Sequence, residues 1–166
     1  MRLKGGDPYV FGRGGEEAIF LNEHNIKVSV VPGISSSIAA LSYAGIPITH
    51  RGLSKGFRVI TAHSKADMLT NIDFSVLTDD EETLVFLMGL SHIDEICSRL
   101  LAAGRKVDTP VAVISKGTLP CQTVCVGTLQ NICAKTIEKG IMSPAIIVVG
   151  KVVSLSEKLS YYMTLP

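Results

Sequence analysis

The sequence predicts an α/β protein made of two connected α/β regions. Short runs of β-branched and apolar residues alternate with segments of helical periodicity along the whole chain. Hydrophobic residues make up 46% of the 166 residues and charged residues 19%, which is enough apolar material for a buried core. The longest apolar run, from Ala145 to Gly150, is far shorter than the roughly 20 residues that a bilayer span requires, so no membrane segment is expected.

Six segments have the composition of β-strands. Four of them are apolar almost throughout, which predicts strands that are covered on both faces. In residues 121–126, Cys121, Thr123 and Cys125 alternate with Gln122, Val124 and Val126. The two faces of this strand therefore differ, so we expect it at the edge of a mixed sheet. The six predicted strands cover residues 28–31, 58–61, 84–87, 111–114, 123–126 and 146–149.

Four helices are predicted from the residues at their ends. Serine or threonine favours a helix start, and a glycine favours a helix end. Two glutamates after Gly14-Gly15 also favour a helix start, because the first turn attracts acidic side chains. The first predicted helix runs from Glu16 to Asn25, and the second from Ser35 or Ser36 to Tyr43. The third runs from the residue after Ser91 to the residue before Gly104, and the fourth from the residue after Thr128 to Gly140.

A polar, glycine-containing stretch at residues 49–56 separates the two predicted regions. We therefore place a domain boundary there, with a first domain at residues 1–52 and a second at residues 53–166. About 50 residues are too few for an independent α/β domain, so we expect the first to be a truncated domain with a parallel sheet. The second is expected to hold a mixed sheet with flanking helices.

The net charge and the cysteines indicate which partners, compartment and metal sites to expect. Sixteen Lys and Arg residues against fifteen Asp and Glu residues leave a net charge of +1, which does not favour nucleic acid as a partner. The amino terminus has no apolar stretch after its positive charges, and four cysteines without a secretion signal indicate reduced thiols in the cytoplasm. The spacing of Cys121, Cys125 and Cys133 is not that of zinc ligands, so no metal site is expected.

A glycine-rich loop at residues 5–17 is the densest motif of the chain. Five glycines within eleven positions allow a close approach of the backbone to a small ligand. The spacing fits neither a dinucleotide fingerprint nor a P-loop. The loop is therefore either a binding loop of another kind or a tight turn without a ligand.

A second loop, at residues 30–37, leaves a predicted strand and opens a helix with serines. Free N–H groups and hydroxyls at such a position can bind a ligand at the carboxyl edge of a sheet. A serine that only caps its helix is the alternative interpretation.

These two loops and several later segments resemble the tetrapyrrole methylase family. The first loop has the form found in those members that methylate uroporphyrinogen III at carbon, whereas the later motifs are shared more widely. The matching segments cover residues 2–17, 30–36, 43–51, 84–89, 110–118 and 143–150.

The resemblance implies a two-domain methyltransferase that binds S-adenosylmethionine between its domains, releases S-adenosylhomocysteine and works as a homodimer. The implied reaction is C-methylation of uroporphyrinogen III to precorrin-2, on the route to sirohaem and cobalamin. Asp7 would favour the cationic groups of the cofactor, and Met88 would contact its adenine. The positions that match the family's cofactor-binding residues are Gly5, Gly6, Asp7, Val10, Ser35, Ser36, Met88 and Gly117.

The tetrapyrrole substrate carries many carboxylates, so basic residues near the two loops are candidate substrate-binding residues. Arg2, Lys4, Arg13 and Arg51 are the candidates, and solvated surface charge is the alternative for each of them. His50 and His63 are weaker candidates for substrate contact.

The family's proton acceptor and proton donor lie before the first motif, so the catalytic residues are unknown for this chain. We therefore expect a truncated enzyme with weak or no turnover. Two alternatives stay open. The chain could be a non-catalytic module for cofactor binding or dimerisation, or it could belong to a methylase of another tetrapyrrole intermediate.

Overall fold

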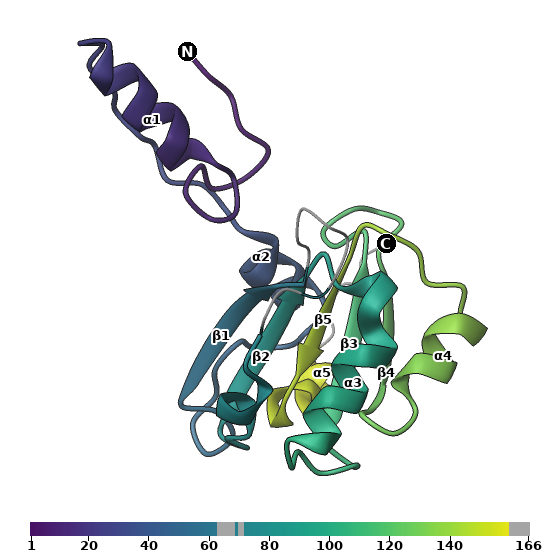
Figure 1. Ribbon diagram of the computed structural model, residues 1–166. Coiled ribbons are helices and arrows are strands. Elements are labelled where there is room, and N and C mark those ends of the chain that lie inside the picture. The colour runs from purple at the N-terminus through teal and green to yellow at the C-terminus, as the bar shows by residue number, and fades with distance from the viewer. Residues whose placement is uncertain (63–68, 70–71, 160–166) are drawn as a thin grey trace.

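A five-stranded sheet organises the molecule. The computed structural model describes residues 1–62, 69 and 72–159 (Figure 1). The strands are β1 (Gly56–Thr61), β2 (Glu82–Leu87), β3 (Pro110–Ser115), β4 (Thr123–Thr128) and β5 (Ala145–Val149), in the spatial order β1-β2-β5-β3-β4. Strand β1 runs parallel to β2, and the other pairs are antiparallel. The α/β class, the mixed sheet and the edge position of β4 are thereby confirmed.

Within the described residues, five α-helices and three short 3-10 helices accompany the sheet. The α-helices are α1 (Gly14–Glu23), α2 (Ser36–Tyr43), α3 (Ile93–Ala102), α4 (Ile132–Glu138) and α5 (Ser156–Leu159). The 3-10 helices are η1 (Phe74–Leu77), η2 (Leu90–His92) and η3 (Lys151–Leu155). The sequence indicated the first four α-helices but none of the 3-10 helices, which are too short to carry a periodic pattern.

The sheet is covered on both faces, and each face has its own core. Because side chains alternate along a strand, Leu84 and Phe86 of β2 face one core while Val85 and Leu87 face the other. The first core includes buried side chains of α3 and α4. The second includes those of α2 and η3. The prediction that β2, β3 and β5 are covered on both faces is therefore confirmed.

The helix ends agree with the sequence signals in part. Ser35 caps α2, since its Oγ accepts a hydrogen bond from the Ser37 N–H at 3.3 Å. Gly104 and Gly140 follow α3 and α4 with φ of 109° and 62°, the left-handed conformation typical of a helix end. The predicted caps at Ser91 and Thr128 are wrong. Ser91 lies inside η2, and α4 begins three residues later than predicted, after Asn131.

The predicted strand at residues 28–31 is also wrong. These residues form no β-ladder with any described part of the chain, and all four are exposed. A strand needs a neighbour for its backbone N–H and C=O groups, and the apolar composition of a segment does not supply one.

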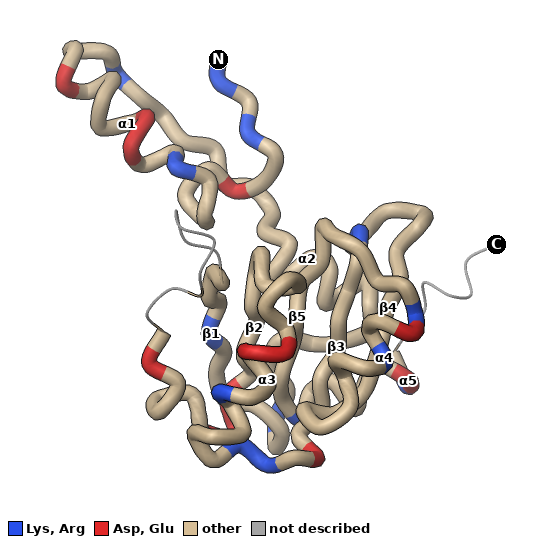
Figure 2. The backbone as a smooth tube through the Cα atoms, turned by 45° about the vertical axis from the view of Figure 1, so that its right-hand side comes forward, with Lys and Arg blue, Asp and Glu red and all other residues tan. Residues whose placement is uncertain are grey.

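Residues 1–35, which we call the N-terminal arm, project from the sheet. In Figure 1 the arm and α1 extend away from the body that holds the five strands, and α2 lies where the arm joins it. Figure 2 shows the same separation from a second direction. Among the helices described, none is both long and apolar enough to cross a membrane.

Candidate functional site

A cavity of about 780 Å³ lies where the N-terminal arm meets one end of the sheet. The sheet contributes the carboxyl ends of β2 and β3 and the amino end of β5. The arm contributes both loops that the sequence analysis singled out. The lining residues of the arm and α2 are Lys4, Gly5, Gly6, Asp7, Val10, Phe11, Gly12, Ile34, Ser35, Ser36, Ala39 and Ala40.

The glycine-rich loop folds tightly over Pro8. The Gly14 N–H donates to the Pro8 carbonyl oxygen at 2.9 Å. A Cβ at Gly12 or Gly14 would lie 2.8 or 2.5 Å from that same oxygen, closer than such contacts allow. These two glycines therefore serve the packing of the loop itself. Gly5 differs, since a Cβ there would meet no atom within 4 Å.

Asp7 joins the first loop to the second. Its carboxylate accepts hydrogen bonds from the N–H groups of Gly33, at 3.0 Å, and Tyr9, at 2.8 Å. Its own N–H donates to the Ile34 carbonyl oxygen at 3.2 Å. The bonds from Gly33 and Tyr9 lower the pKa of the Asp7 carboxyl, so the group is ionised at neutral pH. The site therefore contains one fixed negative charge at the junction of the two loops.

A second close contact holds the loops together. A Cβ at Gly33 would lie 2.7 Å from the carbonyl oxygen of Gly6. Only glycine at position 33 permits this approach of the two backbones. The loops are thus joined by both backbone packing and the Asp7 hydrogen bonds.

The wall formed by the sheet contains unusual backbone conformations. Met88, Lys116 and Thr118 have φ of 55°, 51° and 71°, values that non-glycine residues rarely adopt. All three line the cavity. Between the last two, Gly117 packs against α2, where a Cβ would lie 2.4 Å from the Cβ of Ala40. Strained backbone of this kind clusters at ligand sites.

The structure brings the predicted cofactor-binding residues to one cavity. All eight of them line it: Gly5, Gly6, Asp7, Val10, Ser35, Ser36, Met88 and Gly117. Their role as ligand contacts remains a prediction. Lys116 and Thr118 were not among the predicted residues, although both follow strand β3 at the same edge as Gly117. Their position after a predicted strand was the signal that could have identified them.

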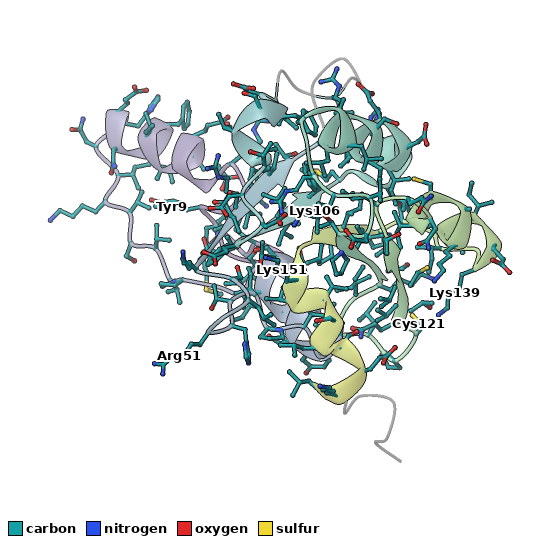
Figure 3. The ribbon with its side chains drawn as sticks, turned by 90° about the horizontal axis from the view of Figure 1, so that it is seen from below. Tyr9, Arg51, Lys106, Cys121, Lys139 and Lys151 are labelled. Atoms are coloured by element: carbon teal, nitrogen blue, oxygen red, sulfur yellow. The ribbon has the colours of Figure 1, made fainter. Side chains whose placement is uncertain are left out.

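The four predicted substrate-binding residues are placed less uniformly. Lys4 lines the cavity, with its Nζ 2.9 Å from Glu17 Oε1 and its side chain 15% exposed. Arg2 contacts the same carboxylate at 3.4 Å but lies outside the cavity lining. Arg13 also lies outside it and pairs with Glu16 at 2.7 Å. In Figure 3, Arg51 points away from the body of the protein.

Among the residues that the structure describes, no histidine or cysteine lines the cavity. The Nδ1 atom of His50 lies 2.9 Å from the carbonyl oxygen of Arg51, and His63 lies outside the described residues. Burial raises the pKa of the Cys97 and Cys133 thiols, which keeps them protonated. Within the described residues, no group of three or more His, Cys, Asp or Glu side chains could hold a metal ion.

Comparisons with known proteins agree with this geometry. The chain is 48% identical over 166 residues to a porphyrin biosynthesis protein HemD of Ruminiclostridium josui, and 45% identical over 162 residues to a siroheme synthase of Saccharophagus degradans. The matched regions include 100% and 98% of this chain, respectively. The chain spans about a third of the length of these curated relatives, 33% and 35%.

Solved structures of methyltransferases are also similar to this chain. A uroporphyrin-III C-methyl transferase of Thermus thermophilus, complexed with S-adenyl homocysteine, matches with a TM-score of 0.77 and 35% identity. The match covers 93% of this chain and 66% of that one. A cobalt precorrin-4 methyltransferase shares the fold, with a TM-score of 0.81 at 23% identity. The family model of the tetrapyrrole (corrin/porphyrin) methylases matches residues 1–133. The chain belongs to the tetrapyrrole methylase family.

Proposed function

We propose that this chain forms the cofactor cleft of an S-adenosylmethionine-dependent methyltransferase that methylates uroporphyrinogen III at carbon, giving precorrin-2 for sirohaem or cobalamin. The observation that carries the proposal is the single cavity to which both loops and the carboxyl ends of β2 and β3 contribute. The similarity to a transferase complexed with S-adenyl homocysteine supports it.

The residues of the cavity fit S-adenosylmethionine chemically. The cofactor carries a cationic sulfonium and a cationic ammonium group, and the ionised Asp7 is a negative charge on the cavity lining. It also carries a carboxylate, and the amino end of α2 at Ser36 favours an anion. Met88, Leu87 and Ile146 provide apolar contact for the adenine.

The chain's own residues would bind and orient the reactants. When bound, S-adenosylmethionine supplies a methyl group on a sulfonium, which a nucleophilic carbon can take in one displacement while the thioether leaves. The loops joined through Asp7 would fix the position of that methyl group. Lys4 would attract a substrate carboxylate at the cavity, and Arg2, Arg13 and Arg51 remain proposed contacts for other carboxylates.

Calorimetric titration with S-adenosylhomocysteine tests the cofactor proposal. Gly5→Leu adds a side chain on the cavity lining, where its Cβ meets no protein atom within 4 Å. We expect this variant to fold and to lose at least about tenfold in affinity, because the side chain takes ligand volume. Gly15→Leu is the matched control, since a Cβ there also meets no atom and Gly15 lies outside the cavity lining. Absence of binding by the unchanged chain, or equal affinities of the two variants, would contradict the proposal.

Turnover is a separate question from binding. A chain that binds S-adenosylhomocysteine but transfers no methyl group to uroporphyrinogen III would act as a cofactor-binding module. A screen of other tetrapyrrole intermediates with radiolabelled S-adenosylmethionine distinguishes uroporphyrinogen III from a different substrate. Methylation of another intermediate but not of uroporphyrinogen III would overturn the substrate proposal.

We further propose that the protein works as a homodimer in the cytoplasm. Exposed apolar side chains on the N-terminal arm support association, with Ile19 61% and Phe20 59% exposed. All four cysteines are free thiols, which suits a reducing compartment. Sedimentation should give a dimer that Ile19→Glu/Phe20→Glu converts to a monomer. Ile137→Glu, on an exposed position of α4, is the control and should leave the dimer intact. A monomeric unchanged chain would contradict the proposal.

A further inference from the structure

A second cavity lies at the opposite end of the sheet from the cofactor cavity. Its volume is about 260 Å³, and its charged lining residues are Asp80, Arg105, Lys106, Asp108 and Lys151. Asp80 precedes β2 and Lys151 follows β5, whereas the cofactor cavity lies at the other ends of these two strands. Figure 3 views the molecule from the end that carries Lys106 and Lys151. The two cavities are therefore separate sites.

Arg105 is a buried cation at the base of this second cavity. Its side chain is fully buried. Its Nε donates to the Leu77 carbonyl oxygen at 2.7 Å, and its Nη2 donates to the Glu82 carbonyl oxygen at 3.3 Å. Within the described part of the chain, its Nη1 has no hydrogen-bond partner. A buried guanidinium nitrogen without a partner is costly, so this atom has an unused capacity to bind an anion.

Three cations converge on the carboxylate of Asp80. Its oxygens lie 3.7 Å from Arg105 Nη1, 3.1 Å from Lys106 Nζ and 4.0 Å from Lys151 Nζ. The Lys106 contact is a hydrogen bond, whereas the Arg105 and Lys151 contacts are longer than one. The Asp80 carboxylate thus forms a hydrogen bond with Lys106 but not with Arg105 Nη1 or Lys151 Nζ.

Two neighbouring acidic residues, Asp79 and Glu82, act on Arg105 by charge but do not line the cavity. The Oε1 of Glu82 lies 2.8 Å from Arg58 Nε, and among the described residues its buried Oε2 has no hydrogen-bond partner. Asp79 accepts a hydrogen bond from the Glu81 N–H at 2.8 Å and is also outside the lining. Among the lining residues, three cations face two carboxylates.

We propose that this cavity binds a small tetrahedral dianion, phosphate or sulfate, and that Asp80 occupies the position of the anion when none is bound. A water molecule takes about 30 Å³ in the liquid, so the cavity has room for such an ion with part of its hydration shell. The four oxygens of such an ion can form hydrogen bonds with all three cations, which the two oxygens of the Asp80 carboxylate do not. On binding, the Asp80 side chain turns toward solvent, which it already reaches with 29% of its surface.

Three variants test the site in calorimetric titrations with sodium phosphate and, separately, sodium sulfate, at an ionic strength held constant with sodium chloride. Lys106→Ala/Lys151→Ala removes two exposed cations and should weaken binding by at least about tenfold. Asp80→Asn removes the internal competitor and should strengthen it by about tenfold. Lys139→Ala changes a lysine that follows α4, lies apart from Lys106 and Lys151 in Figure 3 and is not among the lining residues, so it should leave the affinity unchanged.

The results separate the sources of the anion and can overturn the proposal. Binding of both ions, or of one alone, identifies the ligand of this site. No saturable binding of either ion, or an affinity that is unaltered in Lys106→Ala/Lys151→Ala, would overturn it. If Asp80→Asn does not fold, the lysine variant still decides, because both lysines are at the surface. Titration with S-adenosylhomocysteine should give equal affinities with and without phosphate, since the two cavities lie at opposite ends of the sheet.

Discussion

The N-terminal arm and the five-stranded sheet contain the same kinds of apolar residue but bury them to very different extents. Phe86 and Val148, on strands of the sheet, are 0% exposed, whereas Val31 and Ile34 of the arm are 80% and 70% exposed. The sheet residues are enclosed because neighbouring strands and helices cover both faces. Burial therefore depends on a partner as much as on composition, and the arm is ordered by other means.

The largest expected difference between the two regions is in stability. Phe86→Ala should lower the free energy of unfolding by about 3–5 kcal/mol, because Phe86 is fully buried and stacks on Phe74 with ring centroids 6.5 Å apart. Val31→Ala, at a position 80% exposed in the arm, should change it by less than about 0.5 kcal/mol. Urea denaturation measures both values. Similar losses in the two variants would show that the arm is packed against apolar surface in solution.

The next effect concerns the junction of the two loops. Gly33→Ala places a Cβ 2.7 Å from the Gly6 carbonyl oxygen, so one backbone must move. An overpacked contact costs about 1–3 kcal/mol, and we expect S-adenosylhomocysteine affinity to fall by roughly thirtyfold, about 2 kcal/mol. Gly15→Ala is the control and should leave the affinity unchanged. An unaltered affinity in Gly33→Ala would mean that the cofactor does not need the loops in this arrangement.

A smaller effect is expected at the edge of the sheet. Lys135 of α4 and Lys139, which follows it, donate from Nζ to the carbonyl oxygens of Val126 and Val124 on β4, at 3.2 and 2.8 Å. These lysines protect an edge strand by satisfying its free carbonyl groups. Lys135→Ala/Lys139→Ala should lower the free energy of unfolding by about 1 kcal/mol and promote association. Denaturation and light scattering measure the two effects, and no change in either would contradict the protective role.

The same contrast explains which parts of the fold the sequence predicts. Strands β1 to β5 are predictable because apolar runs and alternation reflect burial on one or both faces. The strand expected at residues 28–31 fails for the opposite reason, since no described segment pairs with it. The α4 start was misplaced because Thr128 and Asn131 are both good cap residues, and local sequence does not choose between them.

The candidate site is predictable to a similar degree. The eight residues expected to bind the cofactor do line one cavity, because motif spacing places them at strand ends and loops. The pairing of Lys4 with Glu17 and the positive φ of Lys116 were not predictable. Both depend on how segments meet in three dimensions. The cations around Asp80 were missed for the same reason, because Lys151 lies far along the chain from Asp80 and Arg105.

The smallest predicted effect tests how the arm is ordered. Hydrogen bonds from Gly33 and Tyr9 lower the pKa of Asp7 below its usual value of 3.8. The stabilisation they give is therefore fully present above pH 3.8 and is lost as the pH falls through the lower pKa of the folded chain. A carbon-detected NMR titration of Asp7 should give a midpoint below 3.8. Asp7→Asn should weaken S-adenosylhomocysteine binding and remove its loss at acidic pH. A midpoint at or above 3.8 would mean that the two loops are not joined through Asp7, and the backbone contact of Gly33 with Gly6 would then be left to hold them together.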